Sequence, residues 1–338
     1  MKQAVTVSVR HIETREAPEP RDPGPGEALI AVKAVGICGS DIGMWTGTDP
    51  YASFPIRQGH EFSGRIMRLG PGHPGRVGLG DLCAVEPLLP DGTCIACRRG
   101  HPNCCVNLRV FGAHIDGALV ERMIVPVANL FPAGDLTPEL AAFAEHVSIG
   151  LQIVMRSGMG PGDQAVIFGA GPIGQAIQIA ASDRGARLMT VDVVDGRLDR
   201  ARANGAEVTV NSREEGLAAA VADWTEGDGP TVVFEATGVP EIVRTAIDLV
   251  AYSGTIVVAG TSIGDATIPS LALVKKEINL LGSRNNAGLY AEAVDLVRRH
   301  RQRCERLITQ RFALGEVQDA LEFGDTNPAA SNKMMVVL

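Results

Sequence analysis

The chain has 338 residues, of which 45% are hydrophobic and 21% are charged, and its formal net charge is −8. This length exceeds the usual size of a single domain, so we expect two domains, each with a sizeable core. A net negative charge is not typical of proteins that bind nucleic acid or anionic membranes, so we expect neither as a partner.

The start of the chain predicts a cytoplasmic protein. Residues 1–5 lack the apolar core of a signal peptide. The longest apolar region, residues 165–181, is interrupted by Gly, Pro and Gln, which argues against a membrane span.

The first half of the chain has the pattern of a β-rich, barrel-like domain, because prolines divide it into short alternating segments. Cys38 follows one such segment, residues 28–33, and His60 precedes another, residues 62–66. A thiolate and an imidazole at the rim of a sheet suit a catalytic zinc that keeps one coordination position open. The alternative is a buried free cysteine beside a hydrogen-bonded histidine.

Glu61 directly follows His60. Neighbouring residues on a strand point to opposite faces, so both reach one metal only if the backbone turns there. Glu61 is therefore either a direct ligand or a carboxylate behind the ligands.

Four cysteines lie close together further along, at Cys94, Cys97, Cys104 and Cys105. In a large chain without a secretion signal, such a cluster favours metal binding over disulfides.

From about residue 150, apolar segments alternate with helical patterns, which is typical of a doubly wound parallel sheet and an α/β fold. The predicted strands are 165–168, 188–191, 208–211, 231–235, 255–259 and 278–281, with helices around 197–204, 213–224 and 241–250. A helix at 290–299 and a closing strand at 333–338 are predicted after them.

The first of these strands leads into a dinucleotide-binding fingerprint. The glycines of GxGxxG between a strand and a helix let the backbone approach a pyrophosphate at the helix N-terminus. Asp192 ends the second strand, where a carboxylate accepts hydrogen bonds from ribose hydroxyls and repels a 2′-phosphate. The pattern therefore predicts NAD rather than NADP, although an ordinary strand-end acid is the alternative for Asp192. The expected cofactor-binding residues are Gly169, Gly171, Pro172, Ile173, Gly174, Asp192 and Arg197.

Together these motifs resemble those of the zinc-dependent medium-chain dehydrogenase/reductase superfamily, to which alcohol dehydrogenases belong. The resemblance covers essentially the whole chain and rests on the order and spacing of residues 36–41, 59–64, 80–81, 169–174, 192, 235–238 and 254–257. Within the superfamily the chain is most similar to polyol, sugar and threonine dehydrogenases, through residues 85–87 and Glu145. The resemblance implies a GroES-like catalytic domain at 1–146 and 285–338 and a Rossmann NAD-binding domain at 147–284.

The resemblance also implies a set of metal ligands. Cys38 and His60 hold the catalytic zinc, with Glu61 or Glu145 as a further donor, directly or through water. The alternative for Glu145 is a solvated acid on a helix face.

Three more residues take roles from the same resemblance. Ser40 accepts the substrate proton, unless it is a serine that only caps a turn. Arg284 approaches the substrate or the glutamate near the zinc, unless it is a solvated arginine. Lys333 pairs with Glu61 or with a cofactor phosphate.

The structural lobe of the family carries four cysteines, and this chain departs from that pattern. Aligning Cys97 with the family motif puts the first ligand position on Asp91. The resemblance then implies a structural zinc held by Asp91, Cys94, Cys97 and Cys105, with Cys104 as a bystander. The alternative is a lobe without metal that contains free thiols.

The expected function is NAD-dependent and zinc-dependent oxidation of a secondary alcohol to a ketone. The resemblance implies a small polyol-type substrate (a polyol, sugar, cyclitol or hydroxy amino acid) and a homo-oligomer, either a dimer or a tetramer. A simple alcohol or aldehyde reductase is one alternative, and a non-catalytic dinucleotide-binding protein of the same fold is another.

Overall fold

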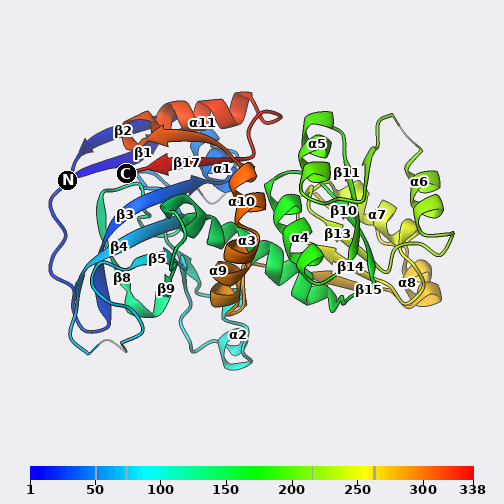
Figure 1. The fold of residues 1–338 in the computed structure, drawn as a ribbon, viewed down its shortest axis with the longest axis horizontal. Coiled ribbons are helices and arrows are strands. Elements are labelled where there is room, and N and C mark those ends of the chain that lie inside the picture. Colours follow the sequence, from blue (N-terminus) through cyan, green and yellow to red (C-terminus); the bar gives the residue numbers. More distant parts are fainter. Residues whose placement is uncertain (50–51, 73–74, 215, 262–263) are drawn as a thin grey trace. The chain divides into compact units, whose positions relative to one another are not determined.

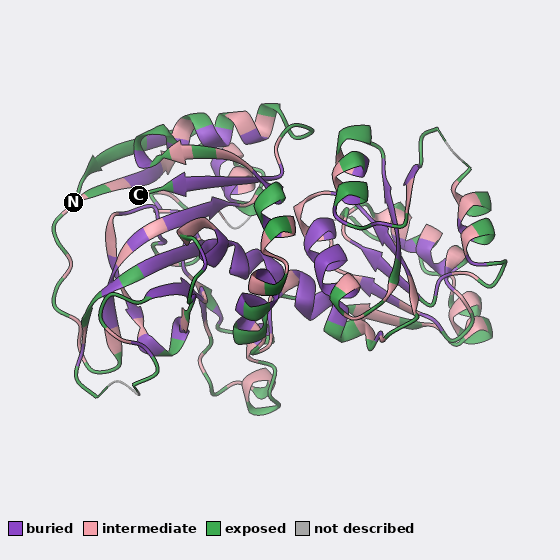
Figure 2. Cartoon of the chain, viewed as in Figure 1, coloured by how far each residue is buried: buried purple, intermediate pink, exposed green. Residues whose placement is uncertain are grey.

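The structure is a computed structural model that describes residues 1–49, 52–72, 75–214, 216–261 and 264–338. The chain divides into two compact units: a first unit of Met1–His146 and Ala287–Leu338, and a second unit of Val147–Asn286. Buried residues concentrate in the sheet strands of each unit (Figures 1 and 2). Within the described ranges, no helix has both the length and the apolar character needed to cross a membrane.

The first unit is built on a mostly antiparallel sheet, which confirms the β-rich prediction. In the described part of the chain its strand order is β16-β17-β3-β4-β5-β9, and β8 pairs with β3. The strands are β3 (Glu27–Ile37), β4 (Glu61–Leu69), β5 (Leu82–Val85), β8 (Arg122–Pro126), β9 (Leu130–Pro132), β16 (Ile308–Ala313) and β17 (Lys333–Val337).

The register of this sheet brings three distant parts of the chain to one end. Gly36, near the end of β3, pairs with Glu61, the first residue of β4. Ile37 pairs with Met334 of β17. Because Cys38 follows β3 directly, the residues around it lie beside the start of β4 and the start of β17.

Short elements surround this sheet. They are β1 (Lys2–Ser8), β2 (His11–Glu16), α1 (Gly39–Thr46), β6 (Leu88–Leu89), α2 (Ile95–Arg98), η1 (Pro102–Cys104), β7 (Arg109–Val110), η2 (Val127–Asn129), α9 (Tyr290–Arg299), α10 (Arg301–Leu307), η3 (Leu314–Glu316) and α11 (Val317–Thr326). The helix α3 (Pro138–Ser157) begins in the first unit and ends in the second.

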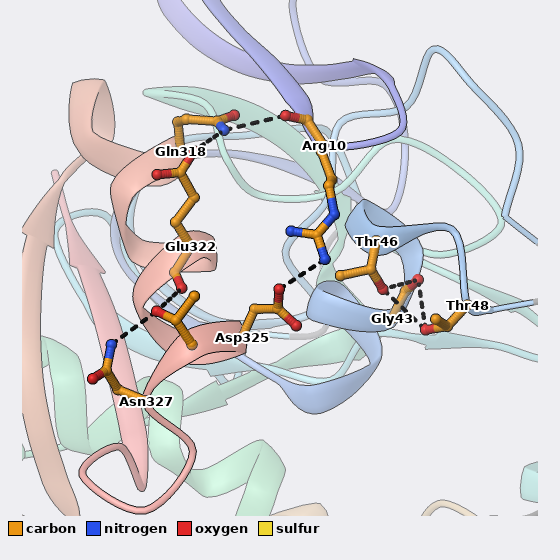
Figure 3. A network of polar contacts seen from close by, with 9 residues as sticks. Arg10, Gly43, Thr46, Thr48, Gln318, Glu322, Asp325 and Asn327 are labelled. Carbon is orange, nitrogen blue, oxygen red and sulfur yellow. Dashed lines mark hydrogen bonds and ion pairs between the residues drawn. The ribbon is translucent and has the colours of Figure 1, made fainter.

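Helix α11 is tied to the N-terminal hairpin and to α1. Arg10 Nη2 donates to Asp325 at 2.9 Å, and Gln318 Nε2 donates to the Arg10 carbonyl at 3.2 Å (Figure 3). The Arg10 guanidinium also lies over the Trp45 ring of α1, with its Cζ 4.9 Å from the ring centre. These contacts hold the C-terminal segment against the helix that contains Ser40.

The second unit has a parallel sheet with helices on both faces, as predicted. Its strand order among the described residues is β12-β11-β10-β13-β14-β15. Helices α4 and α5 cover one face, and α7 and α8 cover the other (Figure 1). The strands are β10 (Gln164–Phe168), β11 (Arg187–Asp192), β12 (Val208–Asn211), β13 (Val232–Glu235), β14 (Thr255–Val258) and β15 (Asn279–Gly282). The helices are α4 (Pro172–Asp183), α5 (Asp195–Ala203), α6 (Leu217–Trp224), α7 (Pro240–Leu249) and α8 (Ser270–Lys276).

One helix starts later than the sequence predicts. The pattern predicts a helix from residue 213, whereas α6 begins at Leu217, after Gly216. The Asn211 side chain accepts a hydrogen bond from Arg213 N at 3.1 Å, and the Asn211 carbonyl accepts one from Glu214 N at 3.0 Å. This local turn after β12 competes with the helix for the same backbone groups.

Candidate functional site

Cys38 is the N-cap residue of α1, immediately after the long central strand of the first unit. The Asp41 carboxylate accepts a hydrogen bond from Cys38 N at 2.9 Å, which fixes the turn between the strand and the helix. Ser40 lies in the first turn of the same helix and is exposed to solvent. The sheet therefore positions the thiol of Cys38, and the helix positions the hydroxyl of Ser40 two residues later.

His60 immediately precedes β4, and its ring faces the same aspartate. His60 Nδ1 lies 3.6 Å from Asp41 Oδ2, which leaves Nε2 as the nitrogen available to a metal. Burial by itself lowers the pKa of His60, but the nearby Asp41 carboxylate outweighs it and raises that pKa well above its usual range. Asp41 belongs to the motif at residues 36–41, and its position three residues after Cys38 is the signal that points to it.

The backbone around His60 is held by glycines that touch one another. Gly59 has a φ of +95°, a conformation that L side chains rarely adopt. A Cβ on Gly112 would lie 2.7 Å from the carbonyl carbon of Gly59, and one on Gly117 would lie 2.4 Å from its oxygen. Side chains at these positions would push the backbone before His60 out of place.

Glu61 forms a buried ion pair with Lys333. The Lys333 Nζ donates to both carboxylate oxygens, at 2.6 and 2.7 Å, and both residues are at most 1% exposed. Burial by itself raises the pKa of Glu61, but Lys333, His146 and His60 together lower it to about 2. Of the two partners that the resemblance implies for Lys333, the structure therefore pairs it with Glu61.

Glu145 lies on α3 and is buried, with 6% of its surface exposed. Burial and the nearby Glu61 carboxylate raise the pKa of Glu145 to about 7. The neighbouring His146 is also buried, and its Nδ1 lies 3.9 Å from a Glu61 oxygen. The two glutamates of the site are thus in different environments: Glu61 is ionised and paired, whereas the pKa of Glu145 is close to neutral pH.

Among the described residues, Cys38, His60 and Glu61 bring one ligand atom each to within 4.8 Å of one another. One thiol, one imidazole and one carboxylate at this separation fit the donor set of a catalytic zinc, which needs three protein ligands and one open position. Glu145 is not a member of this group of donors. Arg284 follows β15 in the second unit and is exposed.

A second donor group lies in the lobe around α2. Asp91, Cys94, Cys97 and Cys105 also place their ligand atoms within 4.8 Å of one another. The sulfurs of Cys94 and Cys97 are 3.5 Å apart, close to the separation of about 3.8 Å expected for two thiolates on a tetrahedral zinc. Cys104 is exposed and is not a member of the group. The set fits a closed structural metal site.

Asp91 is held in place for this role by its neighbours. Its Oδ1 accepts hydrogen bonds from Thr93 N at 2.8 Å and Cys94 N at 3.0 Å, and Asn107 Nδ2 donates to Oδ2 at 2.6 Å. The backbone amides of Cys94 and Thr93 and the Asn107 amide lower the pKa of Asp91. The carboxylate is therefore ionised over the physiological range.

In the second unit, two glycines of the turn between β10 and α4, Gly169 and Gly174, have no room for a side chain. Gly169 has a φ of +99°, and a Cβ on Gly174 would lie 1.7 Å from the Gly169 oxygen. Gly171 is the N-cap of α4, followed by Pro172 at the first helical position and then Ile173. This leaves helix N–H groups available to an anion such as a pyrophosphate.

Asp192, at the end of β11, links this turn to the next helix. Its Oδ2 accepts a hydrogen bond from Ala170 N at 2.7 Å, and its Oδ1 accepts from Val193 N at 2.7 Å and Val194 N at 3.0 Å. Arg197 Nη1 lies 3.9 Å from the same carboxylate. Carboxylate oxygens accept about two hydrogen bonds each, so Asp192 retains capacity for a ribose hydroxyl.

Comparisons with known proteins agree with this geometry. Residues 24–135 match the alcohol dehydrogenase GroES-like domain, and residues 172–299 match the zinc-binding dehydrogenase family. The chain is 32% identical over 301 residues to L-galactonate-5-dehydrogenase of Escherichia coli strain K12, covering 89% of this chain and 88% of that protein.

Two solved structures have the same fold over 100% of this chain and 99% of their own. One is a short chain alcohol dehydrogenase from E. coli CFT073 complexed with NADH, with a TM-score of 0.91 and 29% identity. The other is a zinc-binding dehydrogenase from Sinorhizobium meliloti 1021 bound to NADP, with a TM-score of 0.91 and 30% identity. The chain therefore belongs to the zinc-type alcohol dehydrogenase family of medium-chain dehydrogenase/reductases, on its polyol dehydrogenase branch.

Proposed function

We propose that the protein is an NAD-dependent and zinc-dependent dehydrogenase that oxidises a secondary alcohol of a polyol, sugar, cyclitol or hydroxy amino acid to the ketone. The observation that carries this proposal is the group formed by Cys38, His60 and Glu61, whose ligand atoms lie within 4.8 Å of one another. Three mixed protein donors are typical of catalytic zinc, whereas structural sites use four. Membership of the family supports the reaction type.

Different residues of the first unit bind the metal and transfer the proton at this site. Cys38, His60 and Glu61 would hold a zinc ion, with Glu145 behind them, and the metal when bound supplies Lewis acidity toward a substrate hydroxyl. The exposed Ser40 is the acceptor for the proton of that hydroxyl. Glu145, with a pKa raised to about 7 by burial and by Glu61, is able to exchange a proton near neutral pH.

The cofactor preference follows from Asp192. Its buried carboxylate lies where the ribose of a dinucleotide binds in this fold, and a second negative charge from a 2′-phosphate would be repelled. Two cations, Arg197 at 3.9 Å and Arg200, interact with the same carboxylate and would soften this repulsion. Replacing Asp192 with Ala should therefore reduce discrimination against NADP, which kcat/KM for the two cofactors measures. A wild-type preference for NADP would contradict the assignment.

The second donor group supports a structural zinc held by Asp91 and three cysteines. Elemental analysis of never-chelated protein should then give two zinc ions per subunit. Replacing Cys97 with Ser should remove one of them and lower the thermal stability, while NADH binding persists. One zinc per subunit in the wild type would rule out the second site.

The substrate class is supported by the density of polar groups around the site and by a relative that acts on L-galactonate. The decisive experiment follows NADH absorbance with zinc-loaded protein and a panel of polyols, cyclitols, L-threonine and unsubstituted secondary alcohols. A site built to bond several hydroxyls should prefer its best polyhydroxylated substrate by at least about 100-fold in kcat/KM.

Two other results of the same panel would favour the alternatives. Comparable kcat/KM for a simple secondary alcohol would indicate an alcohol reductase. Turnover of no substrate by zinc-loaded protein that still binds NADH would indicate a non-catalytic dinucleotide-binding protein. As a control, replacing His60 with Ala should abolish turnover and leave NADH binding intact, because the cofactor residues belong to the second unit.

A further inference from the structure

A chain of buried polar side chains leads from the first strand of the protein to the candidate metal ligands. Thr6 Oγ1 donates to Gln58 Oε1 at 2.6 Å, and Gln58 Nε2 donates to the Asp41 carbonyl at 2.8 Å. The same Nε2 lies 3.5 Å from Asp41 Oδ1. Asp41 in turn bonds Cys38 N and faces His60 Nδ1. Every polar atom of the Gln58 amide is therefore engaged in this chain.

Packing alone does not explain an amide at position 58. Thr6 is 0% exposed, and Gln58 and Asp41 are each 1% exposed. Burying polar groups carries a desolvation penalty that an aliphatic side chain of similar size would avoid. What the amide adds is direction: its oxygen is fixed by the Thr6 hydroxyl, so its nitrogen must point at Asp41.

The backbone of Gln58 is itself held on both sides. Ile56 exchanges two hydrogen bonds with Thr6 of β1, at 2.9 and 3.0 Å, and Leu119 N donates to the Gln58 carbonyl at 3.1 Å. His60 follows only two residues later. Gln58 is thus a fixed point between the strand behind the site and the loop that contains the imidazole.

We propose that Gln58, backed by Thr6, is a positioning residue that holds Asp41 between Cys38 and His60 and so pre-organises the two ligands for zinc. The inference rests on the proposed function, since it requires zinc at Cys38 and His60. Groups behind the ligands of a metal orient them, and losing one typically weakens metal affinity about 10–100-fold. Replacing Gln58 removes only its contact with Asp41, so we expect a loss of zinc affinity at the lower end of that range.

The test measures zinc affinity by chelator competition, with zinc as the only added ligand, at a temperature well below unfolding. Gln58→Leu should weaken zinc binding about tenfold. Thr6→Val should weaken it less, and Thr6→Ser, which keeps the hydroxyl, should restore the wild-type value. With Co²⁺ in place of zinc, the ligand-field absorption bands should shift in Gln58→Leu and Thr6→Val but not in Thr6→Ser.

Gln178 provides a matched control in the second unit. It is 0% exposed, its Nε2 donates to the Ala201 carbonyl at 2.7 Å, and its Oε1 accepts from Thr190 Oγ1 at 3.2 Å. Gln178→Leu should therefore lower thermal stability without changing zinc affinity or the Co²⁺ spectrum.

The outcomes separate the inference from the proposed function. Cys38→Ser identifies the zinc of this site, because the variant should contain one zinc fewer than the wild type. If Cys38→Ser contains as much zinc as the wild type, the assignment of zinc to Cys38 and His60 is wrong, and the proposed function fails with it. If it loses one zinc while Gln58→Leu and Thr6→Val keep the wild-type affinity and spectrum, only the positioning role is overturned. Should Gln58→Leu fail to fold, Thr6→Val and Thr6→Ser decide the question alone.

Discussion

The buried pair of Lys333 and Glu61 allows a quantitative prediction for Lys333→Met. Methionine keeps most of the volume of the lysine stem but removes the ammonium that bonds both oxygens of Glu61 at 2.6 and 2.7 Å. The carboxylate, 0% exposed, is then left in the interior without its cation. Removing one partner of a buried pair costs about 3–5 kcal/mol, because the remaining charge is uncompensated.

The assay is thermal unfolding of metal-free protein, followed by the fluorescence of Trp45. The first unit contains Trp45 and the second contains Trp224, so a Trp224→Phe background reports on the first unit alone. The expected loss corresponds to a decrease in melting temperature of roughly 6–20 °C, taking about 2–4 °C per kcal/mol for a domain of this size. Zinc should stabilise Lys333→Met more than it stabilises the wild type, because a cation next to Glu61 replaces the lost ammonium.

Two comparisons make the reasoning refutable. The double variant Lys333→Met with Glu61→Gln should be more stable than Lys333→Met alone, since it removes the carboxylate that Lys333→Met leaves without its cation. Arg21→Met breaks a pair of similar length with Glu27, at 2.6 and 2.8 Å, but that pair is exposed, so solvent screening predicts little change. A loss below about 1 kcal/mol for Lys333→Met, or a double variant as unstable as the sum of the two single changes, would show that the pair does not stabilise the first unit.

Further expectations concern the glycine turn, the thiols and the metal. Gly174→Ala should weaken NADH binding in a fluorescence titration, because its Cβ would lie 1.7 Å from the Gly169 oxygen; unchanged affinity would contradict the tight turn. A thiol reagent at neutral pH should modify the exposed Cys104 in the folded protein and spare Cys83 and Cys304, whose pKa values burial raises to about 12; peptide mass analysis that finds either buried thiol labelled would contradict this. Chelation should abolish dehydrogenase activity and leave NADH affinity unchanged, and activity that survives complete zinc removal would contradict the role of the metal.

The fold of the second unit was predictable because each of its strands leaves a local signature. The run at 165–168 and the glycines after it specify a buried strand and a turn within a few residues, and β10 extends only one residue beyond that run. Helix α8 was not predicted, because it is short and none of its residues is buried. Its sequence therefore lacks the apolar stripe by which an amphipathic helix is identified.

Local motifs indicate the candidate site only where its residues are close in sequence. Cys38 and His60 lie in compact motifs, whereas Lys333 and Glu61 are 272 positions apart, and their pairing was one of two options that only the family resemblance implied. That contact depends on the pairing of β17 with β3, which no local pattern specifies. Gln58 was missed for a related reason. Its side-chain amide is oriented by a hydrogen bond from Thr6, which lies on a strand 52 positions earlier in the chain.

The contacting glycines before His60 have a consequence for how this protein can diverge. Gly59, Gly112 and Gly117 meet backbone to backbone, so the path of the chain into the imidazole is set by main-chain atoms. Substitutions elsewhere in the first unit can reshape the surroundings of a substrate without altering that path. A change at any one of the three would require compensating shifts in the others, which makes it a rare step in a lineage and a poor choice in a mutagenesis library. Specificity in this enzyme is therefore expected to evolve around a nearly invariant ligand loop.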